Sequence, residues 1–316
     1  MEPSTGLKPK ISIILPAMLG YDSVIAALDS WEAQRCRNQL EILLLCPTRP
    51  DHPIPSEHVV VETRSMRLHE ARAAAVRKAA AEFVMFAEDH CLPDPECVEV
   101  LLHRIEEPWD AVGTALRSGD PRMAVTQGSF LITYSQWMLP TRGPISHLPG
   151  HNVVVRKAAL LNLGSELEEE LLFGAFLMKR LRLDGCRFYV DDQARMRHFD
   201  PPNWARSVQI FFTIGMGCGA IRLKRSSMVA RVLYGLLIPM IAARHFGRGL
   251  IDYVRTGPRA GFGLKGLFAS AILACVWAGG EAVGAWRGLA RVTPTLWSSE
   301  IKPVSREQVR CIRRSG

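Results

Sequence analysis

Short apolar runs alternate with longer helix-like patterns through the amino-terminal part of the chain. The strand patterns cover residues 11–16, 41–46, 58–61 and 83–86, and the helix patterns cover 23–34 and 68–81. Apolar runs without alternating polar positions are typical of strands that are covered on both faces of a sheet. Strands that alternate with helices of this length predict an α/β fold with a doubly wound, mostly parallel sheet. Its right-handed crossovers would bring the carboxyl ends of the strands to one edge.

The strand pattern at 83–86 leads into a charged segment, Glu88-Asp89-His90. Open α/β sheets bind their ligands at the carboxyl ends of the strands, so these side chains are candidates for a site. In an extended backbone Glu88 and His90 would point to the same side, which is the spacing needed to grip one metal ion. The alternative is an acidic turn that only closes the strand.

Two apolar segments mark the carboxyl-terminal third, at 228–243 and at 266–286. The first contains Arg231 and the second is interrupted by Glu281, so neither offers the roughly 20 apolar residues of an ordinary membrane span. Five basic residues lie between the segments and would face outward if both segments spanned, against the positive-inside rule. The pattern predicts two helices that lie in the membrane interface or enter it as a hairpin. The alternative is a helical subdomain in solution.

Length and charge agree with this division. The 316 residues suit an α/β domain over 1–225 and a membrane-associated helical region over 226–316. The net charge of +8 suits an anionic partner such as a nucleoside diphosphate or lipid head groups. Nucleic acid is not expected, because the basic residues are dispersed and no nucleic-acid-binding motif is present. The eight cysteines form no CxxC pair and residues 1–10 contain no apolar signal segment, so we expect reduced thiols and a cytoplasmic α/β domain.

Several short motifs follow one another in a fixed order. They are Pro16 at the end of the first strand, the strand 41–46, Arg72, Glu88-Asp89-His90, Gly150-His151-Asn152 with Arg156, the segment 177–185, and the strand 187–196 followed by His198. In order and spacing this set resembles the inverting nucleotide-sugar glycosyltransferases of family 2, which have the GT-A fold. The resemblance covers residues 9–225. It implies transfer of a sugar from a nucleotide-sugar donor to a hydroxyl group, with inversion.

The resemblance implies a divalent cation, Mn²⁺ or Mg²⁺, at the acidic strand end. Such an ion neutralises the charge that develops on the diphosphate leaving group. His90 stands where the family usually has its last acid, and imidazole suits Mn²⁺ better than Mg²⁺. The alternatives are weak metal binding, or Glu88 or Asp89 as the ligand instead. By the resemblance His198 approaches the metal or the diphosphate; the alternative is a surface histidine.

The donor-binding residues implied by the resemblance are Pro16, Asp51, Arg72, Glu88 and Asp89. Cys46 stands where the family has an acid that reads the base. A thiol cannot accept two hydrogen bonds from a base edge as a carboxylate can. Asp51 matches the second acid of that loop and is the candidate substitute, and the identity of the base stays open.

Inversion needs a general base that deprotonates the acceptor hydroxyl. The family takes it from a Glu-Asp pair about a dozen residues before the glycine that matches Gly185, and that count lands on 173–174, which is not acidic. The nearest acids predict Glu169 or Glu170 as the base. The alternatives are a base elsewhere, an inactive protein, or acids that only favour a helix start through its dipole. His151 and Asn152 are expected on the acceptor side.

The sequence therefore predicts an inverting glycosyltransferase at the cytoplasmic face of the membrane, attached peripherally, as a monotopic protein or by a hairpin. Its acceptor would be lipid-linked or a polysaccharide. The alternative is an inactive glycosyltransferase-like scaffold or partner protein, which Cys46, His90 and the missing Glu-Asp pair favour. A nucleotidyltransferase is disfavoured, because the segment 16–20 has one glycine and no basic residue.

Overall fold

The computed structural model describes residues 8–50, 58–64, 66–138 and 142–300. The chain divides into two compact units. We call Met1–Ala115 with Pro140–Arg197 the sheet unit, and Leu116–Leu139 with His198–Gly316 the helical unit. The sequence predicts a boundary after residue 225, between the α/β domain and the helical region, and this boundary stays a prediction.

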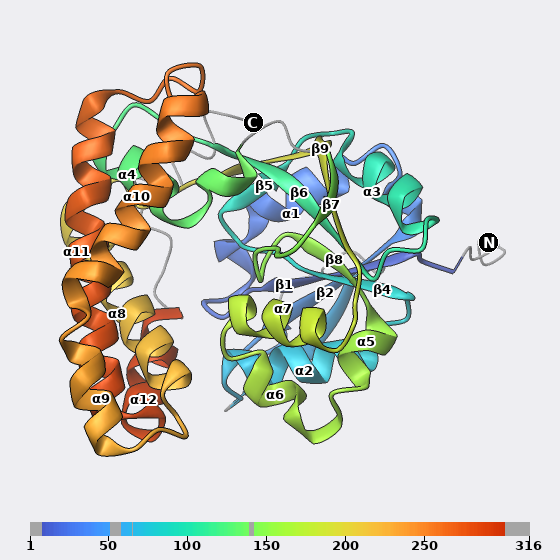
Figure 1. The fold of residues 1–316 in the computed structure, drawn as a ribbon. Helices are drawn as coiled ribbons and strands as arrows, with labels where there is room; N and C mark the ends of the chain where they lie inside the picture. Colours follow the sequence, from blue (N-terminus) through green and yellow to red (C-terminus); the bar gives the residue numbers. More distant parts are fainter. Residues whose placement is uncertain (1–7, 51–57, 65, 139–141, 301–316) are drawn as a thin grey trace, which may run out of the picture. The chain divides into compact units, whose positions relative to one another are not determined.

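A nine-stranded sheet forms the framework of the sheet unit (Figure 1). Its order is β3 (His58–Glu62), β2 (Leu40–Cys46), β1 (Ile11–Pro16), β4 (Phe83–Phe86), β8 (Val153–Arg156), β6 (Ala111–Ser118), β9 (Phe188–His198) and β5 (Cys91–Pro93), and β7 (Gly143–Ile145) pairs with β9. The first four strands of this order are parallel, whereas β8 joins β4 and β6 in antiparallel fashion. The predicted α/β fold is confirmed, and the strands predicted at 11–16 and 83–86 have those bounds.

Some helices of the sheet unit pack directly on these strands, and others pack on neighbouring helices. The helices of this unit are α1 (Ile25–Glu32), α2 (Leu68–Lys78), α3 (Cys97–Ile105), α5 (Lys157–Leu161), α6 (Leu167–Glu170) and α7 (Gly174–Leu183). Helix α2 begins with a capping box in which the Glu70 carboxylate accepts from the backbone N–H of Arg67 at 2.7 Å. The strand side chains Ile13, Leu43 and Leu44 are at most 1% exposed, which places the core along β1 and β2.

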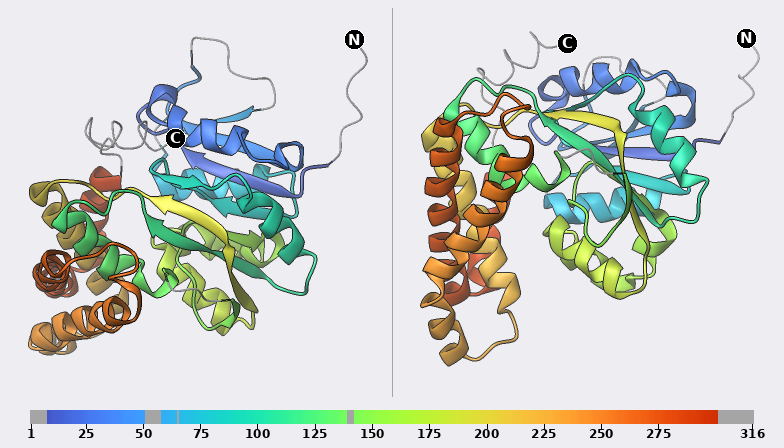
Figure 2. Two further views of the ribbon diagram at one scale, coloured as in Figure 1. Left: turned by 90° about the horizontal axis from the view of Figure 1, so that it is seen from above. Right: turned by 45° about the horizontal axis from the view of Figure 1, so that its top comes forward.

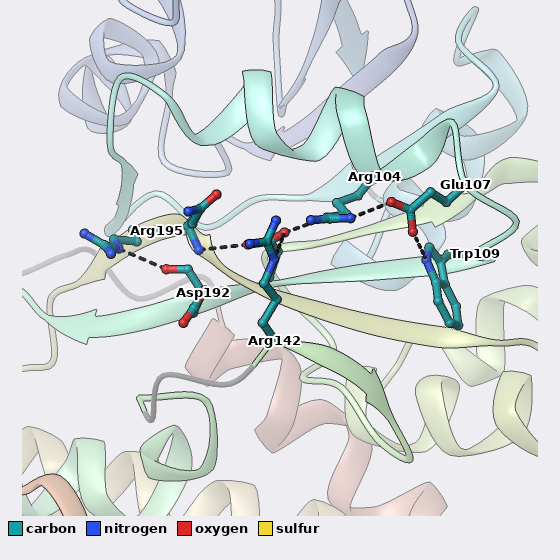
Figure 3. Close-up of polar contacts among 8 residues, drawn as sticks. Arg104, Glu107, Trp109, Arg142, Asp192 and Arg195 are labelled. Atoms are coloured by element: carbon teal, nitrogen blue, oxygen red, sulfur yellow. Dashed lines mark hydrogen bonds and ion pairs between the residues drawn. The ribbon is translucent and has the colours of Figure 1, made fainter.

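A buried carboxylate fastens β9 inside the sheet unit (Figure 3). Asp191 is 0% exposed, and one carboxylate oxygen accepts from Arg104 Nε at 2.6 Å and lies 3.4 Å from Arg142 Nε. The Arg104 guanidinium also bonds Glu107, whose other oxygen accepts from Trp109 Nε1 at 2.8 Å. The hydrogen bond to Asp191 raises the pKa of Arg104. The network connects α3 and the segment after it to the strand that ends at His198.

The helical unit consists of long helices around α11. Its helices are α4 (Ala124–Thr133), α8 (Trp204–Arg222), α9 (Met228–Gly235), α10 (Ile238–Thr256), α11 (Leu264–Arg287) and α12 (Leu289–Glu300). Helix α11 packs against α4, α8 and α10, and α10 runs beside it (Figure 2). A Cβ on Gly284 would lie 1.8 Å from the backbone oxygen of Met216, and one on Gly219 would lie 2.0 Å from that of Glu281. Glycine therefore lets α8 and α11 touch through their backbones.

Glu281 is the polar centre of the helical unit. It is 0% exposed and accepts hydrogen bonds at 2.5 Å from both Arg222 and Tyr234 and at 2.8 Å from Trp277 Nε1. His245 Nε2 lies 3.5 Å from the same carboxylate. The acid that interrupts the apolar segment in the sequence therefore connects α8, α9, α10 and α11.

Candidate active site

A tight turn follows β4 and carries the charged segment singled out by the sequence. The backbone N–H of Cys91 donates to the carbonyl of Glu88 at 3.3 Å, and Asp89 and His90 occupy the corner. The expectation of an extended backbone is wrong here, because Asp favours turns and the chain folds back at once into β5. The turn nevertheless holds Glu88 Oε1 and His90 Nε2 only 3.9 Å apart. Both side chains are partly buried.

Asp89 fixes the orientation of the His90 ring. Its Oδ1 lies 2.6 Å from His90 Nδ1. With the proton on Nδ1, where Asp89 accepts it, the lone pair of Nε2 points toward the Glu88 side. Metal-binding histidines commonly have such a carboxylate on the second ring nitrogen. Asp89 thus acts through His90.

Asn152 fixes the orientation of Glu88. It is 0% exposed, has a left-handed backbone with φ of 59°, and its Nδ2 donates to Glu88 Oε2 at 2.7 Å. Asparagine adopts this conformation more readily than most residues. The backbone is secured on both sides, since Asn152 N donates to Phe86 O at 2.9 Å and Thr114 Oγ1 donates to Asn152 O at 3.0 Å. The predicted place of Asn152 on the acceptor side stays a prediction; its side chain bonds a metal-ligand candidate.

One buried acceptor in this cluster points to a ligand. Asn152 Oδ1 is buried and has no hydrogen-bond partner in the part of the chain that the structure describes. Buried amide oxygens normally have a donor or an ion beside them. An oxygen of this kind next to Glu88 fits a site that takes up a cation or its water.

The loop that carries Asn152 touches the first residue of α7. A Cβ on Gly174 would lie 2.4 Å from Gly150 Cα, and one on Gly150 would lie 2.0 Å from Gly174 Cα. Residues 173–174 are where the family spacing would place an acid. The backbone contact explains why position 174 has no side chain.

The predicted catalytic acids lie one turn earlier, on α6. Glu169 is exposed, and Glu170 Oε1 lies 3.9 Å from Arg180 Nη1. Their neighbours are paired more closely: Glu166 with Arg180 at 2.7 Å, and Glu168 with Arg77 at 3.1 Å. The role of Glu169 or Glu170 as the base stays a prediction.

The predicted donor residues lie at strand and helix ends of the sheet unit. Pro16 is the last residue of β1, and Arg72 is buried on α2. Asp51 lies outside the described residues. Cys46 ends β2 and is 0% exposed, and burial raises the pKa of its thiol to about 11. It is therefore a neutral thiol that cannot replace a carboxylate.

His198 ends β9 and belongs to the helical unit. It is 4% exposed, its Nδ1 lies 3.2 Å from Asp200 Oδ2, and its ring centroid is 4.4 Å from that of Tyr134. The alternative that it is a surface histidine is wrong, because these neighbours and its burial show an enclosed side chain. Its role at the metal stays a prediction. The partly buried His151 directly precedes Asn152.

The sequence indicated Glu88, Asp89, His90 and Asn152 as site residues, but not that Asp89 and Asn152 orient the other two. The hydrogen bond from Asn152 to Glu88 joins positions 64 residues apart, so local spacing carries no sign of it. The Gly-His-Asn order was the available signal, because Asn after a glycine-containing turn is a candidate for a positive φ.

The α/β sheet with its acidic, histidine-containing turn after β4 is of the GT-A type. Residues 54–164 match the family described as "Glycosyl transferase family 2", and this match supports a glycosyltransferase. Among solved structures it is similar to S. aureus TarS 1-349, with 15% identity, a TM-score of 0.46, and coverage of 84% of this chain and 90% of that one. For another crystal structure of S. aureus TarS the identity is 16%, the TM-score 0.45 and the coverage 84% and 55%. No curated protein matches the chain.

Proposed function

We propose that the chain transfers a sugar from a nucleotide-sugar donor to a hydroxyl group, with inversion, using a divalent cation at the turn after β4. The observation that carries this proposal is the pair of oriented ligand candidates in that turn. Asn152 holds one oxygen of Glu88, and Asp89 holds the ring of His90. Each candidate ligand is thus fixed by a partner before any ion binds, which is how protein metal sites are usually built.

The residues present fit such an ion. The proposed ligands are Glu88 and His90, with Asp89 behind His90, and the family resemblance adds His198. One carboxylate and two imidazoles suit Mn²⁺ or a later transition metal better than Mg²⁺, which prefers oxygen. A bound cation would neutralise the charge that develops on the donor diphosphate.

The chain's own residues would do the rest. In the reaction the bond between the sugar carbon and the diphosphate oxygen breaks, the acceptor oxygen bonds that carbon from the other side, and the acceptor proton moves to a carboxylate. Glu169 or Glu170 is the proposed base. Arg72, Pro16 and Asp51 are proposed on the donor, and His151 beside the acceptor, as the family resemblance implies.

We place the reaction at the cytoplasmic face of a membrane, with a lipid-linked or polysaccharide acceptor. The support is chemical: the chain is basic and its carboxyl-terminal helices are rich in apolar residues. Attachment would be peripheral, monotopic or by a hairpin.

The test is a thermal-shift titration of the full chain with UDP, GDP and their sugar forms, with Mn²⁺, with Mg²⁺ and with neither. Ligands that bind the native state raise the melting temperature by mass action. We expect a metal-dependent shift with one diphosphate, lost in Glu88→Gln and His90→Ala and retained in the surface control Glu96→Gln. No shift with any nucleotide would refute the donor site and favour the inactive scaffold. The buried thiol of Cys46, which stands where the resembled family has an acid, also favours that alternative.

A further inference from the structure

Helices α9 and α10 present a row of large apolar side chains to solvent. We call it the α9–α10 stripe. It consists of Met228, Val229, Val232, Leu233, Leu236, Leu237, Met240, Ile251 and Val254, each between 40% and 73% exposed. No residue of α9 is buried. Exposed apolar surface of this extent marks a site of interaction with another molecule or a membrane.

The spacing places the stripe on one face of each helix. Along α9 the members 228, 229, 232 and 233 recur in pairs four residues apart, and 236 and 237 follow in the break before α10. On α10, positions 251 and 254 lie eleven and fourteen residues after position 240, and these spacings place all three on one face of the helix. Two exposed arginines, Arg244 and Arg255, lie on that exposed face of α10.

Within residues 201–296, which include the stripe, the exposed charged side chains are all basic. Residues 201–296 contain twelve Lys and Arg and just two acids, Asp252 and Glu281. Both acids are turned inward: Asp252 is 5% exposed and accepts from Ser135 Oγ at 2.7 Å, and Glu281 is 0% exposed. In this part of the chain, as the structure describes it, no carboxylate is left at the surface. An apolar face bordered by basic residues matches an anionic lipid surface, where apolar side chains enter the boundary region and cations meet head groups.

The same helices are poorly suited to crossing a membrane. Among the described residues, α11 is the single helix long and apolar enough to do so, and α9 with α10 passes the same test only as a pair bent by 58°. Yet α11 is in backbone contact with α8 and carries the buried Glu281. Helix α10 carries Arg244, Arg248 and Asp252 within its length.

We propose that the helical unit binds the surface of an anionic lipid bilayer through the α9–α10 stripe, with both helices in the plane of the interface and α11 packed against α8. This proposal specifies how the chain would attach to the membrane named under the proposed function. It rests on that proposed function for the choice of a membrane, rather than a second protein, as the binding partner. The site is defined by the stripe, Arg244 and Arg255.

The experiment is flotation of the full chain with phosphatidylcholine vesicles that contain or lack phosphatidylglycerol. The test variant is Val229→Ser with Leu236→Ser, two positions that are 69% and 73% exposed. The control is Leu183→Ser on α7, which is 74% exposed and lies in the sheet unit. We expect binding to the anionic vesicles that salt weakens, a loss of about tenfold or more in the double variant, and no change in the control.

Several results would overturn the proposal. The unaltered chain could fail to bind the anionic vesicles, the double variant could bind them as well as the unaltered chain does, or the control variant could lose as much binding as the double variant. Light scattering can give a further contrary result. If the unaltered chain is a dimer that does not bind vesicles, and the double variant is a monomer, the stripe binds a second copy of the chain. The melting temperature and the nucleotide-induced shift of the double variant should match those of the unaltered chain. Vesicle binding without any nucleotide response would refute the donor site and leave this proposal intact.

Discussion

The two units place their acids in opposite ways. In the sheet unit Asp191 is buried, while Glu88 and Asp89 stay partly exposed in a turn where a ligand can reach them. In residues 201–296 of the carboxyl-terminal helices the acids are Asp252 and Glu281, and both are buried. The edge of the sheet that carries Glu88 and Asp89, here called the reactive edge, needs negative charge that is oriented and accessible to a ligand. A face that binds anionic lipid needs its carboxylates to be buried. The difference shows that the position of carboxylates separates the two roles better than net charge does.

The largest expected effect comes from removing one fully buried carboxylate in each unit. Asp191→Ala leaves Arg104 with a side chain only 11% exposed, so we expect a loss of about 3 kcal/mol or more in unfolding free energy. Glu281→Ala leaves Arg222, which is 37% exposed and can be hydrated, so the loss should be about 1–3 kcal/mol. Urea unfolding followed by fluorescence measures both. A loss in Glu281→Ala equal to or above that in Asp191→Ala would contradict the argument from exposure.

Glycine contacts give the second test, with a control on the same helix. In Gly284→Ala the new Cβ would lie 1.8 Å from a backbone oxygen of α8, so the helices must separate, at a cost of about 1–3 kcal/mol. Gly279 has nothing within 4 Å of that position, so Gly279→Ala should be stabilising by up to about 1 kcal/mol. Thermal unfolding of the two variants should therefore shift in opposite directions. Shifts of the same sign would show that α8 and α11 are not in close contact.

At the reactive edge, Asn152→Gly isolates the amide that holds Glu88. Glycine accepts the positive φ without strain, so the backbone can stay as it is. We expect metal affinity to fall by about 10–100-fold, as for other residues that orient metal ligands, with a small change in melting temperature. Calorimetric titration with Mn²⁺ measures the affinity. Unchanged affinity would mean that Asn152 does not orient a ligand.

The regions predicted best are those whose structure depends on neighbours in the sequence. The strands at 11–16 and 83–86 follow from uninterrupted apolar runs, and their bounds are the predicted ones. The turn at Glu88 was predicted extended, because the hydrogen bond that closes it depends on the chain reversing into β5.

Long-range partners explain what the sequence did not indicate. Glu281 interrupts an apolar segment, and the pattern alone gives no reason for it. Its donors Arg222 and Tyr234 lie 59 and 47 residues away, on helices whose packing must exist first. The contact between Gly150 and Gly174 is of the same kind. Local patterns can therefore predict an element and a candidate ligand, but not the partner that orients it.

The smallest expected effect is on the pH dependence of stability, and it comes from the partly exposed pair of Glu32 and Arg37 in the sheet unit. Burial raises the pKa of Glu32, but hydrogen bonds from Arg37 and His58, each 2.6 Å long, outweigh burial and hold it below the ordinary value. A carboxyl whose pKa is lower in the folded chain adds stability above its unfolded pKa, and that stability is lost as the pH falls through the folded value. Because Glu32 is one-third exposed, we expect less than about 1 kcal/mol. Melting temperatures of Glu32→Gln should fall less steeply on acidification than those of the unaltered chain, whereas the surface variant Glu99→Gln should keep the original slope. Identical slopes in all three proteins would show that the pair adds nothing that titrates.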